Sequence, residues 1–218
     1  MNIDDIKMYS SGALSTFNTI LYSYMIAEDA IKNNVAGDFV ECGVFAGTQV
    51  AAMARAAMNH SQSNRKIHLF DSFEGIPKAG VKDDHTITDL IGKGDGELIS
   101  TGVSVCSIEQ VKSNMRSWRI DPSILVYHKG WFQNTVPDAS KEIGSIAVLR
   151  LDGDLYESTK VCLEHLYSKV SKGGYVIIDD YALNGCKLAV NEFLESVGEK
   201  PNITAIIGGL GPVYFQKA

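Results

Sequence analysis

The sequence predicts an α/β fold, a mostly parallel sheet with helices on both faces and an antiparallel hairpin at its C-terminal end. Short apolar runs alternate with helical patterns along most of the chain, which is typical of parallel strands joined by helices. The last two β-like segments, 203–207 and 212–216, are joined by a glycine-rich turn and form the expected hairpin. In addition, two apolar runs end abruptly in aspartates, and open α/β sheets bind ligands beyond the carboxyl ends of their strands.

Length and composition limit the class of protein. With 218 residues and 45% apolar content, the chain is long enough for one sizeable core, so we expect a single domain over 1–218. The net charge of −6 and the lack of basic runs argue against a nucleic-acid or anionic-membrane surface. Neither a signal-peptide pattern nor a membrane-spanning apolar run is found, and four scattered cysteines predict reduced thiols, so we expect a cytoplasmic protein.

An amphipathic helix is expected over 12–34, within an N-terminal helical extension that covers 1–34. Its apolar residues, among them Leu14, Phe17 and Ile20, recur at helical spacing. This face packs on the core, covers the site or pairs with a second subunit, so a homo-oligomer is one arrangement that the sequence allows.

A glycine-bearing turn follows the first apolar strand and leads into an alanine-rich helix over 49–58. Such a turn brings backbone N–H groups and a helix N-terminus close to a ligand. Its spacing, Glu41-x-Gly43-x-x-x-Gly47, differs from the Gly-x-Gly-x-x-Gly of dinucleotide-binding turns. The acidic start suits a positively charged ligand such as S-adenosylmethionine; a purely structural turn is the alternative. The residues expected to contact this ligand are Glu41, Gly43, Val44, Phe45, Gly47 and Thr48.

Another acidic residue stands at the end of the second predicted strand, 67–70. Asp71 can accept hydrogen bonds from the two vicinal hydroxyls of a ribose. Alternatively, Asp71 or Ser72 caps a helix. The glycine turn and the acidic strand end together indicate the ligand more specifically than either does alone.

The segment 78–102 is polar, rich in glycine and poorly periodic. A segment of this length inside a domain is usually a functional lid or is disordered. His85 is the only histidine in this expected lid, so it is a candidate for a catalytic base or a substrate contact. A solvated loop histidine is the alternative.

A helix at 107–118 and a third strand at 124–128 are predicted next, and the strand leads into Gly130 and Trp131. An indole after a glycine at a strand end would give a flat wall for an adenine ring. Core packing of Trp131 is the competing interpretation, and the sequence does not separate the two.

Four aspartates are expected to meet at one edge of the sheet. They end two strands that are followed by helices predicted at 158–169 and 184–195. Like charges held so closely are unfavourable unless they are protonated or neutralised by a cation, and an all-oxygen cluster suits Mg²⁺, Mn²⁺ or Ca²⁺ rather than zinc. The four are Asp152 and Asp154 after the run 148–151, and Asp179 and Asp180 after the run 174–178.

Six motifs occur in order along residues 35–215: 37–44, 70–77, 130–132, 149–159, 173–181 and 185–187. On these motifs the chain resembles the macrocin O-methyltransferase (TylF-like) family. These are metal- and S-adenosylmethionine-dependent enzymes that methylate sugar hydroxyls in antibiotic and polysaccharide pathways. The resemblance implies a Rossmann-like class I methyltransferase fold with a seven-stranded sheet.

The resemblance also implies roles for residues of the site. Glu41, Gly43 and Asp71 would hold the cofactor. The chain departs from the family at Lys187, where many relatives carry arginine, and in the segment 78–102, which leaves the acceptor open. Three aspartates would hold Mg²⁺ or Mn²⁺: Asp152, Asp179 and Asp180. Further expected contacts of the cofactor are Ser72, Gly130, Trp131 and Asp152.

The expected reaction is methyl transfer to a sugar hydroxyl, which is a poor nucleophile at neutral pH unless a cation activates it. Asp152 or Asp154 would take the proton, although Asp154 could instead cap the following helix. A methyltransferase of catechol-type phenols and a non-catalytic S-adenosylmethionine-binding protein are the alternatives. A dehydrogenase would need the Gly-x-Gly-x-x-Gly turn, which is missing.

Overall fold

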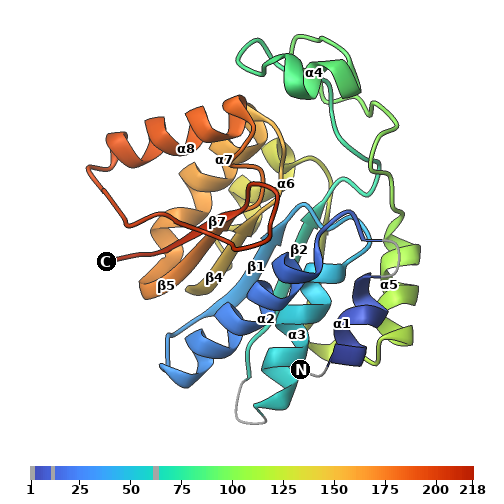
Figure 1. Cartoon of the computed structure of the whole chain (residues 1–218), viewed down its shortest axis with the longest axis vertical. Coiled ribbons are helices and arrows are strands. Elements are labelled where there is room, and N and C mark those ends of the chain that lie inside the picture. Colours follow the sequence, from blue (N-terminus) through green and yellow to red (C-terminus); the bar gives the residue numbers. More distant parts are fainter. Residues whose placement is uncertain (1–2, 11–12, 61–63) are drawn as a thin grey trace.

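The computed structural model describes residues 3–10, 13–60 and 64–218, which form a seven-stranded sheet covered by helices (Figure 1). The strand order is β3-β2-β1-β4-β5-β7-β6, with β7 antiparallel to both β5 and β6. This order confirms the mostly parallel sheet with a closing hairpin. The strands are β1 (Asp38–Cys42), β2 (Ile67–Asp71), β3 (Leu125–Lys129), β4 (Ile146–Leu151), β5 (Val170–Ile178), β6 (Thr204–Ala205) and β7 (Val213–Gln216).

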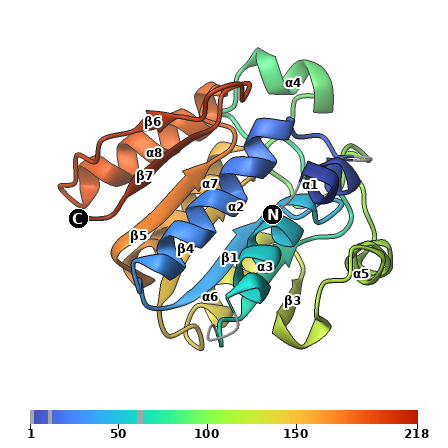
Figure 2. The ribbon, with the colours of Figure 1, turned by 60° about the horizontal axis from the view of Figure 1, so that its bottom comes forward.

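Helices cover the two faces of the sheet in separate layers (Figure 2). Along the central strands, side chains alternate between the layers: Phe39 and Val148 belong to the core under α2 and α3, while Val40 and Leu149 belong to the core under α6, α7 and α8. Both faces are therefore buried, which explains the continuous apolar runs. The helices are α1 (Ile3–Ser10), α2 (Phe17–Lys32), α3 (Thr48–Asn59), α4 (His85–Ile91), α5 (Ile108–Ser117), α6 (Phe132–Ala139), α7 (Tyr156–Leu166) and α8 (Asn184–Ser196), with short 3-10 turns at Pro122–Ile124 and Tyr167–Lys169.

Two of these helices, α4 and α6, are not predicted from the sequence, whereas α1 lies within the helical extension expected over 1–34. α4 has only seven residues, and α6 contains Pro137 in its interior, so neither shows a long helical period. α2 begins at Phe17, where the Thr16 side chain accepts a hydrogen bond from the N–H of Thr19. The predicted helix 12–34 therefore starts too early, and its first residue lies outside the described part of the chain.

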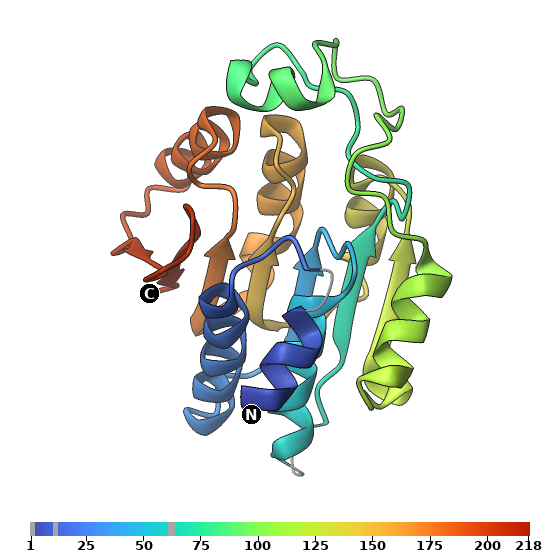
Figure 3. The ribbon, with the colours of Figure 1, turned by 45° about the vertical axis from the view of Figure 1, so that its right-hand side comes forward.

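The segment 78–102 folds across the carboxyl edge of the sheet and carries α4 (Figure 3). Ile87 and Ile91 of α4 form a small core with Ile76, Ala79 and Leu155. The segment is thus anchored to the first residues of α7 by apolar contacts. This position lies over the strand ends where ligands are expected.

No helix in the described residues is long and apolar enough to cross a membrane. All four cysteines are free thiols, and Cys42, Cys162 and Cys186 are buried.

Candidate active site

A cavity of about 250 Å³ lies at the carboxyl edge of the sheet, between the glycine turn (residues 43–47) and the ends of β4 and β5. Its wall brings together strand-end residues from β1, β2, β4 and β5. The topology explains this, because parallel neighbours present their carboxyl ends at one edge. Six acidic residues line the cavity: Glu41, Asp71, Asp152, Asp154, Asp179 and Asp180.

The glycine turn is held by Asp71. One carboxylate oxygen of Asp71, Oδ2, accepts hydrogen bonds from the N–H groups of Val44 at 2.7 Å and Phe45 at 3.1 Å, and Oδ1 accepts from Phe73 at 2.6 Å. Gly43 has φ +94°, and a Cβ there would collide with the backbone oxygen of Asp152, so no other residue fits. Burial raises the pKa of Asp71, whereas these hydrogen bonds act to lower it. Asp71 therefore shapes the turn, and its Oδ1 keeps a lone pair for a ligand.

A buried arginine, not singled out by the sequence analysis, ties β1, β4 and β5 together. Arg150 Nη1 lies 2.9 Å from Glu41 Oε1 and 2.7 Å from Asp152 Oδ2, and its Nη2 pairs with Asp179. Arg150 and Glu41 stand side by side in the β1–β4 register. Burial raises the pKa of Glu41 to about 8, opposed by the Arg150 charge. The second oxygen of Glu41, Oε2, is buried and has no hydrogen-bond partner, so it remains available at the cavity wall.

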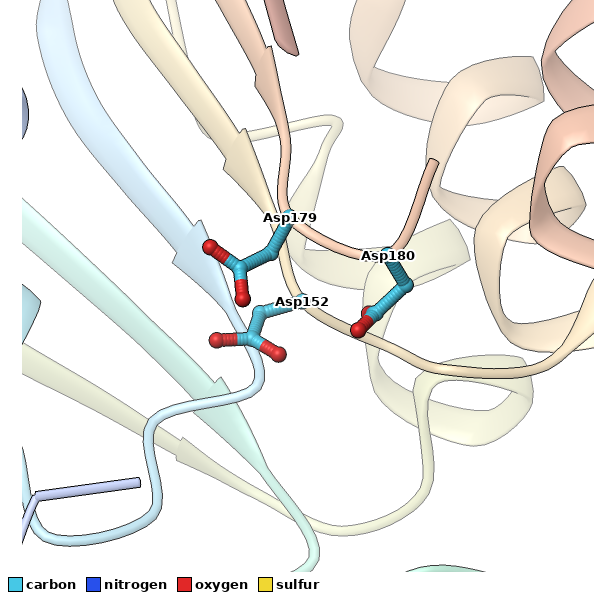
Figure 4. Close-up of side chains that lie close together, drawn as sticks. All are labelled: Asp152, Asp179 and Asp180. Atoms are coloured by element: carbon cyan, nitrogen blue, oxygen red, sulfur yellow. The ribbon is translucent and has the colours of Figure 1, made fainter. Parts of the chain in front are cut away.

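The aspartate cluster (Asp152, Asp154, Asp179 and Asp180) forms the adjoining part of the cavity wall, where the backbone of Asp152 meets Gly43. Carboxylate oxygens of Asp152, Asp179 and Asp180 lie within 4.8 Å of one another, and the three side chains point toward a common space (Figure 4). The N–H of Asp154 donates to Asp180 at 2.8 Å. Burial and the neighbouring carboxylates raise the pKa of Asp154 to about 7 and that of Asp180 well above its usual range. Three hard oxygen donors in this spacing fit an Mg²⁺ or Mn²⁺ ion.

Asp83, from the segment 78–102, caps α7. Its Oδ1 accepts the N–H of Tyr156 at 2.8 Å, and its Oδ2 accepts the N–H of Gly80 at 2.8 Å. The capping role that the sequence allowed for Asp154 is thus filled by Asp83 at Tyr156. Asp154 instead has φ +57°, an uncommon left-handed conformation for a residue other than glycine, and its side chain lines the cavity.

The other expected site residues divide into two groups. Most of those in the turn, together with Ser72 and Trp131, line the cavity; the Thr48 hydroxyl also donates to the backbone oxygen of Tyr9 in α1. Gly47 and Gly130 shape the backbone beside it, with φ +87° and +144°. His85 is exposed at the first residue of α4 and is not among the residues that line the cavity.

The structure adds residues that the sequence analysis did not propose. Gln49 lines the cavity with both atoms of its amide buried and without a hydrogen-bond partner. Leu14 and Gln133 also line it. A glutamine in the first turn of an alanine-rich helix was the available signal for Gln49. For Arg150 the signal was a charged residue inside an apolar run.

The fold and the cavity define a Rossmann-like α/β protein of the class I methyltransferase type. The model of the macrocin-O-methyltransferase (TylF) family matches residues 23–217, so the chain belongs to this family of O-methyltransferases. It is 37% identical over 184 residues to the 8-demethyl-8-(2,3-dimethoxy-alpha-L-rhamnosyl)-tetracenomycin-C 4'-O-methyltransferase of Streptomyces olivaceus, covering 83% of this chain and 67% of that enzyme. It is 41% identical over 170 residues to the demethyldecarbamoylnovobiocin O-methyltransferase of Streptomyces niveus, covering 76% and 61%. The matches thus span about two thirds of the length of these relatives.

A solved structure supports the same class. The O-methyltransferase NovP superposes with a TM-score of 0.81 at 35% sequence identity, covering 93% of this chain and 80% of that chain. Family membership, these relatives and this structure agree that the chain is an O-methyltransferase. The alternative of a non-catalytic S-adenosylmethionine-binding protein is therefore wrong.

Proposed function

We propose that this chain transfers a methyl group from S-adenosylmethionine to a hydroxyl of a sugar, with the aid of a divalent cation. The observation that carries the proposal is the single cavity that the glycine turn and the aspartate cluster line together. The relative with 37% identity is named as the 4'-O-methyltransferase of a rhamnosyl-tetracenomycin, which supports a sugar-containing acceptor.

The turn side of the cavity fits S-adenosylmethionine, which supplies the methyl group. Asp71 Oδ1 can accept a hydrogen bond from a ribose hydroxyl of S-adenosylmethionine. The buried Glu41 Oε2 can accept a hydrogen bond from the amino group of the same ligand. Trp131 lines the same cavity and offers an indole surface to the adenine. Gly43 and Gly47 let the backbone approach the ligand closely.

The aspartate side fits a divalent cation, which favours the developing alkoxide of the acceptor when it is bound. Asp152, Asp179 and Asp180 would hold it. Arg150 pairs with Asp152 and Asp179, whereas Asp180 has no cationic partner among the described residues. A cation at this point would relieve the repulsion between the three carboxylates.

Asp154 is the residue that we assign as general base. Its side chain lines the cavity two residues after Asp152, and its backbone conformation directs it there instead of to the N-terminus of α7. Asp152 is the second candidate, because it lines the same cavity next to Gly43 of the turn. The exposed His85 can serve only if the segment 78–102 brings it inward, so we propose this segment as a lid over the acceptor.

The test is methyl transfer to a panel of glycosides, nucleotide sugars and catechols, with tritiated S-adenosylmethionine. We expect turnover on a sugar that is lost with EDTA and restored by Mg²⁺. Turnover restricted to catechols would replace the sugar by a phenol as acceptor. Turnover on a sugar that persists in EDTA would refute the role of the metal.

A further inference from the structure

Arg150 places a positive charge directly behind the cavity wall. Its side chain has no exposed surface, and it precedes Asp152 by two positions at the end of β4. Glu41 of β1 is its neighbour in the sheet register, and on the other side Asp179 follows its neighbour Ile177 of β5 by two positions. Because residues two apart on a strand point to the same face, one side chain on β4 meets carboxylates from three strands.

The guanidinium binds one oxygen of each of three carboxylates that line the cavity. Nη1 donates to Glu41 Oε1 at 2.9 Å and to Asp152 Oδ2 at 2.7 Å, and Nη2 donates to Oδ1 of Asp179. The second oxygen of Glu41 is buried and has no hydrogen-bond partner. In the described part of the chain, no group donates to the second oxygen of Asp152 or of Asp179 either. Each carboxylate thus keeps one oxygen for a ligand.

Arg65 offers a contrast, because its guanidinium binds the backbone. It donates to the carbonyl oxygens of Val35 and Gly37, which precede β1 at the amino edge of the sheet. Such bonds hold a chain segment in place. Among the described residues, Arg150 binds no backbone group, and its Nε–H is buried without a partner. The hydrogen bonds of Arg150 therefore all go to side chains of the cavity.

Building on the proposed function, we infer that Arg150 is a positioning residue that orients the cofactor side and the metal side of the cavity at once. By holding one oxygen of each carboxylate, it fixes the direction in which the other oxygen points. That oxygen serves the amino group of S-adenosylmethionine at Glu41 and the divalent cation at Asp152 and Asp179. A single change at Arg150 therefore weakens both ligands, although Arg150 contacts neither of them.

Arg150→Lys tests this directly. The variant keeps the positive charge, but one ammonium group does not reproduce the planar fork that reaches three carboxylates. Mn²⁺ alone and S-adenosylhomocysteine alone are titrated by calorimetry into the full chain. We expect Mn²⁺ to bind about tenfold more weakly and S-adenosylhomocysteine about fivefold more weakly. An arginine that only stabilises the fold would lower the free energy of unfolding and leave both dissociation constants of the folded protein unchanged, and that result overturns the inference.

Arg65→Lys is the matched control, because it makes the same substitution at the opposite edge of the sheet. We expect it to lower the free energy of unfolding and to leave both dissociation constants at their native values. If Arg65→Lys weakened both ligands as much as Arg150→Lys does, general loosening of the fold would explain the losses, and the positioning role would be refuted.

A second pair of variants serves if Arg150→Lys does not fold. Glu41→Gln is compared with the double variant Arg150→Met and Glu41→Gln, which leaves no unpaired charge at Glu41. We expect both proteins to bind S-adenosylhomocysteine more weakly. Only the double variant should also bind Mn²⁺ about tenfold more weakly, because Asp152 and Asp179 lose the group that orients them. Equal affinity of the two proteins for Mn²⁺ contradicts the inference.

Failure of the proposed function gives a different result. It appears in the native protein, as a lack of binding of S-adenosylhomocysteine or of Mn²⁺. Native protein that binds both ligands, together with Arg150→Lys that binds both as tightly, refutes the role of Arg150 alone.

Discussion

The two walls of the cavity are both built from carboxylates at strand ends, but they satisfy their charge in different ways. On the turn side, Asp71 accepts three backbone N–H groups from its own neighbourhood. On the other side, Asp152 and Asp179 share the guanidinium of Arg150, and Asp180 accepts one N–H from Asp154. Asp71 is thus largely satisfied by the protein itself, whereas the aspartate cluster carries more negative charge than the protein balances.

This difference explains why acidic residues at the carboxyl ends of different strands of one sheet are proposed to bind different ligands. A carboxylate whose oxygens are bound by fixed N–H groups presents one remaining lone pair in one direction, which suits a hydroxyl. Three carboxylates that converge without enough partners suit a cation. The surroundings of an acidic strand end, and not its presence alone, decide its role.

The largest effect should come from removing a carboxylate of the aspartate cluster. We expect Asp152→Ala to lower kcat at least about 1,000-fold, because the metal loses a ligand and the acceptor hydroxyl loses the cation that activates it. Steady-state methyl-transfer rates check this, with Glu157→Ala, an exposed residue in the first turn of α7, as the control. Native-like turnover by Asp152→Ala would mean that the site is placed wrongly.

Arg150→Met should have the next largest effect, this time on stability. It leaves the buried Glu41 without its counter-charge, and breaking a buried pair costs about 3–5 kcal/mol. Urea unfolding measures this free energy. The double variant Arg150→Met with Glu41→Gln should lose less than the sum of the single variants, since neither charge remains unpaired. Additive losses would show that the two residues do not act as a pair.

Asp71→Ala should mainly affect the turn side of the cavity. We expect S-adenosylhomocysteine to bind about tenfold more weakly, because a ligand hydrogen bond and the support of Val44 and Phe45 are lost together. Metal binding should stay unchanged. The exposed Glu74 is the control position, and Glu74→Ala should leave both constants at their native values. If Asp71→Ala removed metal binding instead, the division between the two walls would be wrong.

Asp83→Ala should have a smaller effect, of about 1 kcal/mol, because it removes a helix cap that holds the segment 78–102 to α7. Faster proteolysis within this segment and a lower kcat are the expected readouts. Asp89→Ala, at an exposed position of α4, serves as the matched control. Equal proteolysis of the two variants would remove Asp83 as an anchor.

The smallest effect concerns a pair of histidines outside the cavity, of which His128 is half-buried. His68 Nδ1 and His128 Nε2 lie 3.0 Å apart. Burial and the neighbouring His68 lower the pKa of His128 to about 4. Because the folded-state pKa lies below the unfolded value of about 6.5, this contribution to stability is complete above pH 6.5 and is lost as the pH falls toward 4. Partial exposure limits it to roughly 1 kcal/mol. His128→Phe should flatten the pH dependence of unfolding, and the exposed His85→Gln should not.

The sheet and the strand-end aspartates could be predicted from the sequence because burial on both faces leaves continuous apolar runs whose ends are visible. Arg150 could not, because its three partners come from β1, the end of β4 and the end of β5. The cap from Asp83 to Tyr156 joins residues 73 positions apart, beyond any local pattern. α6 could not be predicted, because Pro137 in its interior is a residue that usually ends a helix.

The most direct test of the contrast between the two walls is the binding of Mn²⁺, followed by the loss of its free electron paramagnetic resonance signal. We expect one Mn²⁺ per chain in the native protein and in Asp71→Ala, and none in Asp152→Ala at the same concentrations. Equal binding of Mn²⁺ by the native protein and Asp152→Ala would contradict the assignment of the aspartate cluster as the metal site.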